Sequence, residues 1–236
     1  YYKIIMKIIA IIGIRSGSKG IKNKNIKKFI DKPLFLWILQ TLKKSKYIER
    51  IIISTDSKKY QKLVIENGYE APFLRPKKLS LNNSTDFEYI NHAVNYLENK
   101  EGYYPDIIVR TLVTVPLQKI QDIDKAIKTL LKYKRTISSC TIVKESTIHP
   151  LKTYKIKNGF LKTYNDEKNN TEPTPRQIYE KSYVRCNTIV FKRENLNRGY
   201  IAGKKNKPII ASNNLLDIDT HEDFLVNEII KKQENK

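Results

Sequence analysis

Residues Met6–Lys28 read MKIIAIIGIRSGSKGIKNKNIKK, an apolar run that breaks into a basic, glycine-containing loop. The run Lys7–Ile14 is rich in isoleucine, which is typical of a strand buried on both faces of a parallel sheet. Ligands of such sheets gather at the carboxyl ends of the strands, where this loop begins. Small residues leave the loop backbone open to an anion, and Arg15 and Lys19 add positive charge. The segment therefore predicts an anion-binding site at the end of a central strand.

The loop lacks the two best-known phosphate-binding signatures. A Walker A loop requires Gly-Lys-Ser/Thr, whereas this chain has Ser-Lys-Gly, and Gly17 does not open the three-glycine dinucleotide fingerprint. The loop instead resembles the opening motif of the CMP-sialic acid synthetases, the cytidylyltransferases that activate nine-carbon acidic sugars. The residues in register with that motif are Arg15, Ser18, Lys19, Gly20, Lys24 and Asn25. The resemblance implies that these residues bind the nucleotide, with Arg15, Lys19 and Lys24 as the catalytic cations.

Length and composition favour one cytoplasmic α/β domain. The 236 residues suffice for a single sizeable core with a small inserted subdomain. No apolar run reaches the roughly 18 residues of a transmembrane helix, so no membrane partner is expected. Two cysteines without metal-ligand spacing favour reduced, buried thiols and a cytoplasmic location. Met6 is a candidate native start, and the sequence leaves open whether residues 1–5 belong to the native protein.

The net charge of +21 puts a nucleic-acid or membrane partner on the list of alternatives. The excess comes mostly from lysines that are spread over nearly every expected helix and turn. No interleaving of aromatic and basic residues typical of a nucleic-acid-binding module accompanies them. A solvated basic surface is therefore preferred, and no nucleic-acid partner is expected.

Strands and helices are expected to alternate through the first two thirds of the chain. The expected strands are 7–14, 50–55, 106–113 and 137–143, and the expected helices are 33–46, 58–67, 87–100 and 120–134. Repeated β–α–β units give a mostly parallel sheet covered by helices on both faces. The prediction is a Rossmann-like three-layer sandwich of the nucleotide-diphospho-sugar transferase type. Residues 6–144 and 188–236 would form the nucleotide-binding domain, and residues 145–187 an inserted subdomain for sugar binding and dimerisation.

The resemblance continues into the nucleotide site, with departures. Leu74-Arg75-Pro76 and the polar loop after it match a family segment that surrounds the nucleotide base, which implies that Arg75 and Ser84 bind nucleotide. Asp86 is explained equally well as a helix N-cap. The departures are Leu112, Val115 and Gln118, which stand where relatives carry Gln, Ser and Arg. They weaken the expectation that this strand end contacts the nucleotide as it does in relatives.

The inserted subdomain carries two fragments that resemble the acidic-sugar site of the family. His149-Pro150-Leu151-Lys152 and Pro175-Arg176-Gln177 imply that Lys152, Arg176 and Gln177 bind the sugar. A sugar acid offers a planar carboxylate that Arg176 could hold by two parallel hydrogen bonds, while Lys152 adds a point charge. Tyr200 falls where relatives place an apolar or aromatic residue against the sugar. The family's Asn-Gly-Ala-Ile-Tyr is replaced by Cys186-Asn187-Thr188-Ile189-Val190, which indicates a changed sugar surface.

Leu215–Asp223 contains the last informative motif, Asp217-Ile218-Asp219. Alternation along a strand would send both carboxylates to one face, where they could share one Mg²⁺. Asp-x-Asp alone is a weak signal, but in the family it is the metal site. Both motifs together imply Mg²⁺ as the cofactor, held by Asp217 and Asp219.

The expected function is transfer of CMP from CTP to a sialic-acid-like nonulosonic acid with release of pyrophosphate. One alternative is a CMP-Kdo synthetase, whose opening loop matches this chain less well. Another is a non-catalytic binder of nucleotides or nucleic acid. The sequence does not choose between N-acetylneuraminic, legionaminic, pseudaminic and related acids, and it names no general base. The resemblance implies a homodimer, although Val184 stands where some relatives carry a basic residue for the partner's site.

Overall fold

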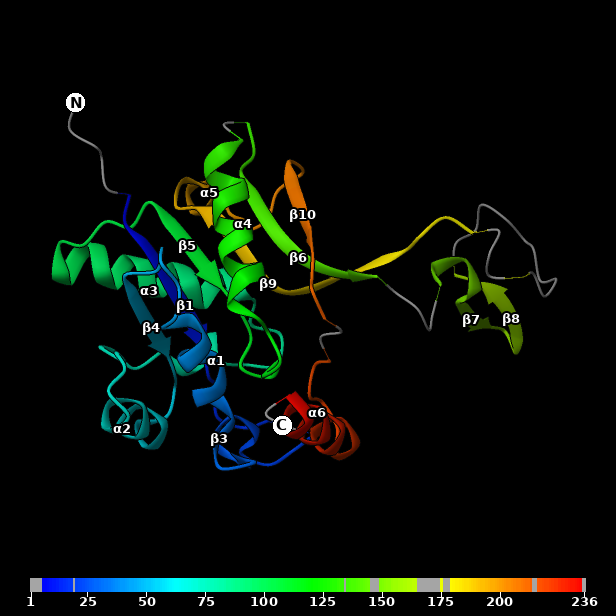
Figure 1. The fold of residues 1–236 in the computed structure, drawn as a ribbon, viewed down its shortest axis with the longest axis horizontal. Helices are drawn as coiled ribbons and strands as arrows, with labels where there is room; N and C mark the ends of the chain where they lie inside the picture. The colour runs from blue at the N-terminus through cyan, green and yellow to red at the C-terminus, as the bar shows by residue number, and fades with distance from the viewer. Residues whose placement is uncertain are drawn as a thin grey trace.

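A six-stranded sheet forms the centre of the protein, in the order β10-β6-β9-β5-β1-β4 (Figure 1). The computed structural model describes residues 6–18, 20–133, 135–144, 149–164, 175, 179–213 and 216–234. The strands are β1 (Ile8–Gly13), β4 (Arg50–Ser54), β5 (Ile107–Arg110), β6 (Ser138–Lys144), β9 (Tyr183–Lys192) and β10 (Asn206–Ile210). Every neighbouring pair is parallel except the two that β9 makes with β5 and β6. The mostly parallel sheet that the sequence predicts is confirmed.

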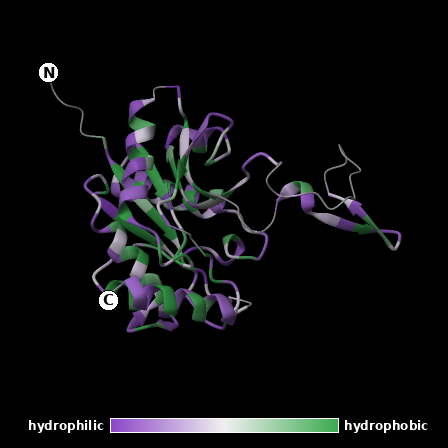
Figure 2. Ribbon diagram, turned by 45° about the vertical axis from the view of Figure 1, so that its right-hand side comes forward, coloured by the Kyte–Doolittle hydropathy of each residue, from purple (hydrophilic) through white to green (hydrophobic). Residues whose placement is uncertain are grey.

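The alternation of side chains along β1 explains why helices cover both faces of the sheet. Ile8, Ala10 and Ile12 pack with α1 (Leu34–Leu42), α2 (Lys58–Glu66) and α4 (Ile120–Lys132). Ile9 and Ile11 point to the other face and pack against α3 (Asp86–Glu101). All five side chains are buried, so β1 has no solvent-facing side. The result is the expected three-layer sandwich, with hydrophobic strands between the helices (Figure 2).

A projecting segment, called the arm here, comprises residues 149–164 and stands away from the sheet (Figure 1). It contains η3 (Pro150–Lys152) and a hairpin of β7 (Tyr154–Lys157) and β8 (Phe160–Thr163), which pair only with each other. The arm is reached from β6 and β9, which stay paired as far as Lys144 and Tyr183. The division at residues 145–187 remains a prediction, and its second boundary falls inside β9.

A small apolar cluster joins the basic loop to the acidic motif near the end of the chain. It contains Ile21, Phe29, Leu34, Ile218 and Phe224. These residues come from the loop, the hairpin of β2 (Lys28–Phe29) and β3 (Lys32–Pro33), α1, the acidic segment and α6 (His221–Glu234). Burial of these side chains brings the two motifs singled out in the sequence to one place.

Three local features differ from the sequence-based expectations. Strand β10 was not expected, because an edge strand containing Lys207 and Pro208 lacks a buried apolar pattern. The segment 216–219 is not a strand, although Ile218 is buried and its flanking aspartates are exposed, as alternation requires. The N-cap of α3 is Thr85 rather than Asp86, because Thr85 forms a capping box with Glu88.

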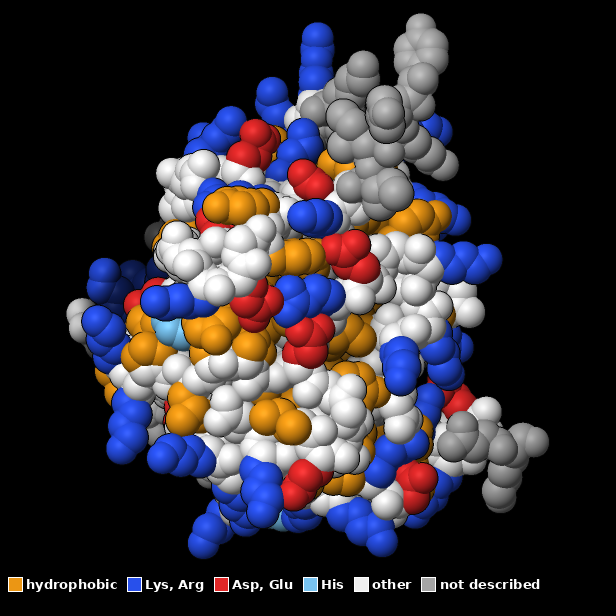
Figure 3. Space-filling view, turned by 90° about the vertical axis from the view of Figure 1, so that its left-hand side faces the viewer, with side chains coloured by type: hydrophobic (Ala, Val, Ile, Leu, Met, Phe, Trp, Pro, Cys, Tyr) orange, Lys and Arg blue, Asp and Glu red, His pale blue; other side chains and the backbone are white. Residues whose placement is uncertain are grey.

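Lys and Arg are dispersed over the face drawn in Figure 3, with acidic, apolar and other side chains between them. Within the described part of the chain, no helix is both long and apolar enough to cross a membrane.

Candidate active site

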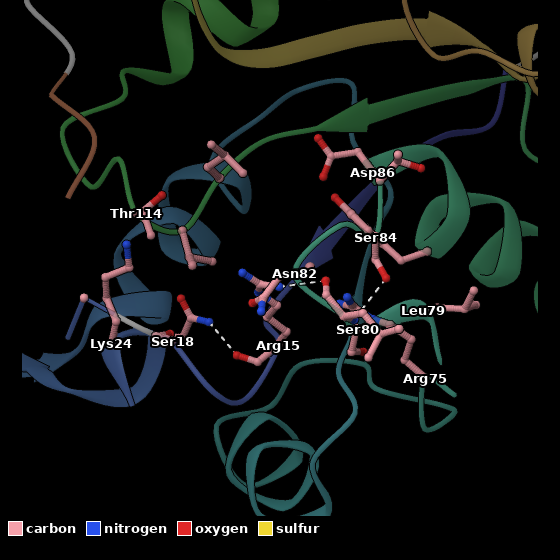
Figure 4. Close-up of a pocket in the computed structure, with 18 of the residues that line it drawn as sticks. Arg15, Ser18, Lys24, Arg75, Leu79, Ser80, Asn82, Ser84, Asp86 and Thr114 are labelled. Atoms are coloured by element: carbon pink, nitrogen blue, oxygen red, sulfur yellow. Dashed lines mark hydrogen bonds between the residues drawn. The ribbon is translucent and has the colours of Figure 1, made fainter. Parts of the chain in front are cut away.

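A cavity of about 400 Å³ opens at the carboxyl ends of β1 and β5 (Figure 4). Its size suits a nucleotide-sized ligand. Eight of the site residues predicted from the sequence line it: Arg15, Ser18, Gly20, Lys24, Asn25, Arg75, Ser84 and Asp219. The remaining wall includes Gly13, Leu79, Ser80, Leu81, Asn82, Thr85, Asp86, Tyr89, Leu112, Val113 and Thr114. The cavity therefore lies where ligands of parallel sheets bind, and most of its charge is positive.

Side-chain hydrogen bonds hold the backbone of the basic loop in place. Asp56, at the end of β4, accepts hydrogen bonds from both the backbone N–H and the hydroxyl of Ser16, each at 2.7 Å. The buried side chain of Asn25 donates to the Arg15 carbonyl at 3.0 Å. Gly17 has a φ of 79°, in the left-handed region that favours glycine. These contacts fix the loop backbone without using the cationic ends of its side chains.

The acidic segment is packed directly against the loop. Ile218 is fully buried and donates its N–H to the Thr114 carbonyl at 2.9 Å. A Cβ at Gly20 would meet the carbonyl oxygen of Asp219 at 2.3 Å, so no larger residue fits there without a backbone shift. On its other side, the Asp223 carboxylate accepts from the N–H groups of Asp219 and Thr220 at 3.0 and 2.8 Å. The backbone of Asp219 is therefore fixed from both directions.

Lys24 links the loop to this segment through its side chain. Its Nζ donates to the Ile218 carbonyl and forms an ion pair with Asp219 Oδ1 at 3.0 Å. The Lys24 side chain is only 12% exposed, while that of Asp219 is 76% exposed. In Figure 4 Lys24 extends toward Thr114, across the cavity from Ser84 and Asp86.

Arg75 forms the opposite wall as a buried cation. It is 5% exposed, its Nε donates to the Ser54 hydroxyl at 3.0 Å, and its guanidinium lies 4.6 Å from the centre of the Tyr89 ring. Burial lowers the pKa of Arg75 from its usual value, although the group remains charged. A Cβ on Gly13 would lie 3.0 Å from the Tyr89 ring and 3.2 Å from Arg75 Nη2. Gly13 thus leaves the room that these side chains occupy.

The polar loop 79–84 closes the cavity over Arg15. Arg15 Nη1 donates to the Leu81 carbonyl at 2.8 Å, and the Leu81 N–H donates to Ser84 Oγ at 3.0 Å. Asp86 lines the same side and pairs with Arg110 of β5, whose Nη1 donates to the Asn187 carbonyl at 3.0 Å. Asp86 therefore pairs with the charge of Arg110. Its interpretation as a helix N-cap did not predict this role.

Asp217 and Asp219 have the chemistry of a divalent-metal site. Both carboxylates are exposed, and they lie close enough that Asp219 contributes to raising the pKa of Asp217. The main cause of that raised pKa is loss of solvation, because protein atoms crowd Asp217 despite its exposed area, and a hydrogen bond with Thr114 opposes it. Mg²⁺ is commonly held by one or two carboxylates together with phosphates of the substrate. Two carboxylates fit that requirement, and the described residues contain no cluster of three or more potential ligands.

Of the other predicted site residues, those that the structure describes do not line the cavity. Asp217 forms a hydrogen bond with Thr114, which is itself a lining residue. Lys152 lies in η3 on the arm, with its Nζ 5.5 Å from the centre of the Tyr179 ring. Lys19, Arg176 and Gln177 lie outside the described residues.

Tyr200 lies at the amino ends of the parallel strands, at the opposite end from the cavity, and its expected contact with the sugar stays a prediction. The antiparallel strand β9 returns the chain to the amino ends of the parallel strands, where Arg193 donates its N–H to the Asp106 carbonyl. Tyr200 follows α5 (Glu194–Asn197) there and donates its N–H to the Asn195 carbonyl. Counting back from the acidic motif cannot reveal this reversal of direction.

The departures from the family pattern mostly face the interior. Gln118 is buried and donates to Thr111 Oγ1 at 2.7 Å, while Thr188 donates to the Gln118 side-chain oxygen. Val115 and Val190 are fully buried, so Val190 does not alter a sugar-facing surface as the sequence suggested. Only Leu112 lines the cavity.

Sequence reasoning missed three contributors to the site. Asp56 was not assigned to the site, although its carboxylate holds the loop through Ser16. Thr114 and Tyr89 were not singled out, although one contacts Asp217 and the other supports Arg75. Asp56 could have been found from its position at the end of a strand beside the basic loop.

Comparison with known proteins gives a consistent result. The cytidylyltransferase family model matches residues 9–228. The N-acylneuraminate cytidylyltransferase of Escherichia coli O18:K1:H7 is 32% identical over 98% of this chain and 53% of its own length. The Helicobacter pylori protein named pseudaminic acid cytidylyltransferase and UDP-2,4-diacetamido-2,4,6-trideoxy-beta-L-altropyranose hydrolase is 30% identical over 74% of this chain and 33% of its own. The chain thus spans about half of the first relative and a third of the second.

A solved structure shares the fold. CMP:2-keto-3-deoxy-manno-octonic acid synthetase in complex with CTP superimposes with a TM-score of 0.71 at 12% identity. The match covers 97% of this chain and 99% of that one. At this identity the similarity concerns the fold alone.

Proposed function

The chain belongs to the cytidylyltransferase family, of which the CMP-sialic acid synthetases are members, and on that premise we propose that it transfers CMP from CTP to a sialic-acid-like nonulosonic acid. The observation that carries the proposal is the meeting of the basic loop and Asp219 in one cavity at the strand ends. A loop that cradles phosphates and a carboxylate pair that suits a metal are the two halves of a nucleotidyltransfer site.

In the proposed reaction, the anomeric hydroxyl oxygen of the sugar attacks the α-phosphorus of CTP in line. The bond from that oxygen to phosphorus forms, the bond to the bridging oxygen breaks, pyrophosphate leaves and the hydroxyl proton passes to solvent. Arg15, Lys19 and Lys24 would neutralise the charge that builds on the phosphate oxygens. Arg75, Ser84 and the rest of the loop 79–84 would hold the nucleoside end of CTP, while Ser18, Gly20 and Asn25 shape the phosphate side.

Mg²⁺ is the proposed cofactor, held by Asp217 and Asp219 through their carboxylates. When bound, it would supply positive charge to the phosphates at the reacting end of the cavity. The chain's own contribution is to fix the Asp219 backbone by the contacts with Gly20 and Asp223.

The acidic sugar is proposed to bind through residues of the inserted segment. Arg176 and Gln177 would hold the sugar carboxylate and Lys152 would add a nearby charge. Because Lys152 lies on the projecting arm, we propose a homodimer in which each arm completes its partner's site. The two relatives above are named for different sugars, so the similarity supports the class of nonulosonic acids and not one member of it.

Cytoplasm is the proposed compartment, in keeping with the buried thiol of Cys140. A CMP-Kdo synthetase is the second candidate, but the solved structure of that type is similar only at the level of the fold. A non-catalytic binder would leave Asp219 without a use in the cavity.

The direct test is pyrophosphate release with each of the four nucleoside triphosphates and Mg²⁺, against a panel of nonulosonic acids and Kdo. The expected result is a signal with CTP and one nonulosonic acid, which would also identify the sugar. A signal with Kdo alone would favour the second candidate, and folded protein that is silent with every pair would refute the proposal.

A further inference from the structure

The ammonium of Lys24 occupies the position at which a cation would contact Asp219. Its Nζ lies 3.0 Å from Asp219 Oδ1 and also bonds to the neighbouring Ile218 carbonyl. Lys24 thus contacts a carboxylate oxygen and a backbone oxygen, both of which are oxygen donors of the kind that hard dications bind. It is also the cation assigned above to the phosphates of CTP, so one side chain has two anionic partners available.

The Lys24–Asp219 ion pair is easily exchanged. The Asp219 side chain is 76% exposed, and ion pairs in contact with water contribute little net stability. A dication carries twice the charge of an ammonium and would therefore be favoured at the same carboxylate.

Exchange requires no movement of the surrounding backbone. Asp219 is fixed by the close approach of Gly20 and by the carboxylate of Asp223, and Ile218 is fixed by Thr114. Only the ends of two side chains, Lys24 and Asp219, must rearrange. Lys24 already lines the cavity, so its ammonium can turn toward a bound phosphate without leaving its place in the fold.

We propose that Lys24 is the resident counter-ion of the nucleotide-free protein: its ammonium pairs with Asp219 until a divalent cation takes the carboxylate, and then transfers to the phosphates. This inference rests on the proposed function and adds an order of events to it. Metal binding and the availability of Lys24 to the nucleotide become one coupled exchange. In the absence of nucleotide, the metal must compete with Lys24.

The test is a calorimetric titration of nucleotide-free protein with Mn²⁺, which needs no turnover. Lys24→Met and Lys24→Gln remove the competing charge, and Lys24→Gln keeps a hydrogen-bond donor in case Lys24→Met fails to fold. The matched control is Lys22→Met, which removes an exposed lysine two residues away. Both Lys24 variants should bind Mn²⁺ about two- to fivefold more tightly than the wild type and Lys22→Met. The gain should vanish in the double variant Lys24→Gln with Asp219→Asn.

Equal or weaker Mn²⁺ binding by the Lys24 variants would overturn the exchange while leaving the metal site in place. Absence of Mn²⁺ binding in every variant would overturn both the inference and the proposed metal site. A gain in the Lys24 variants, in a protein that turns over no nucleotide, would support the exchange and refute the transferase.

Discussion

The cavity and the arm are built in opposite ways. The cavity is supported by buried side chains from distant parts of the chain, such as Arg75 at 5% exposure and Ile218 at 0%. On the arm, Ile156, Phe160 and Leu161 are 78%, 71% and 68% exposed. The cavity residues are held by the sandwich itself, whereas the hairpin β7–β8 pairs only with itself.

The buried scaffold suits the binding of phosphates, and the exposed arm suits contact with another surface. Binding of a triphosphate requires charges held at fixed positions, which a buried scaffold supplies. An isolated two-stranded hairpin is at best marginally stable in water, so the apolar side chains of the arm require another surface. The proposed homodimer would supply that surface. The four predictions below test this contrast between the rigid cavity and the exposed arm.

The largest effect is expected from Asp219→Asn at the cavity. Loss of one carboxylate of the proposed metal pair should lower kcat by about a thousandfold, since metal-supplied charge is worth several kcal/mol to the transition state. The rate of pyrophosphate release at saturating CTP, sugar and Mg²⁺ measures kcat. The Asp219 side chain is exposed, so the unfolding temperature should not change. Asp31→Asn, an exposed carboxylate of the β2–β3 turn, is the control, and retained activity in Asp219→Asn would contradict the metal assignment.

Gly20→Ala should lower kcat by about 10- to 100-fold, because small displacements of catalytic groups have effects of this size. The new Cβ would meet the Asp219 carbonyl at 2.3 Å and push the loop and the acidic segment apart. The comparison is Gly159→Ala on the arm, where φ is 80° but no atom lies within 4 Å. That variant should keep its kcat at saturating substrates. Equal kcat losses in both variants would mean that the close approach at Gly20 has no special role.

Arg176→Ala should raise the KM for the sugar by about tenfold and leave the KM for CTP unchanged, because only the sugar carboxylate loses a charge-assisted partner. Initial rates with each substrate varied in turn measure both constants. Arg198→Ala, at the amino edge of the sheet, should change neither. Equal effects of Arg176→Ala on both constants would contradict its proposed carboxylate role.

The smallest effect is expected from Ile156→Ala on the arm. At protein concentrations at which the protein is monomeric, Ile156→Ala should change the free energy of unfolding by no more than about 0.5 kcal/mol. The same substitution at the fully buried Ile11 should cost about 2–5 kcal/mol. Urea denaturation at two protein concentrations measures both. A loss at Ile156 that appears only at the higher concentration would indicate that a second copy covers the arm.

The sequence predicted best those elements of the sandwich that are buried between its layers. The isoleucine runs of β1 and β4 and the helical spacing of α1 and α4 identify elements that the structure confirms, because their patterns follow directly from burial. The acidic motif was also understood in part: Ile218 is buried between exposed aspartates, even though the segment is not a strand.

The sequence failed where a residue's position depends on chain direction or on distant partners. The sequence did not show that the antiparallel course of β9 carries Tyr200 to the amino ends of the parallel strands, away from the cavity, and its assignment to the sugar stays a prediction. The contact between Asp56 and Ser16, and the pairing of Lys24 with Asp219, join residues that no local pattern connects. Tertiary packing alone creates such contacts, so a single sequence does not reveal them.

The pairing of Lys144 with Tyr183 gives the arm a further property. The chain leaves and re-enters the sheet at a single rung between two neighbouring strands, so the length of the excursion does not affect the register of β6 and β9 below it. The segment between Lys144 and Tyr183 can therefore be replaced without a change in the pairing of β6 with β9. Exchange of residues 145–182 between relatives would replace the segment proposed to recognise the acid as one unit, while the sheet keeps its strand pairing and its core. On that proposal, such an exchange would change the sugar without changing the fold.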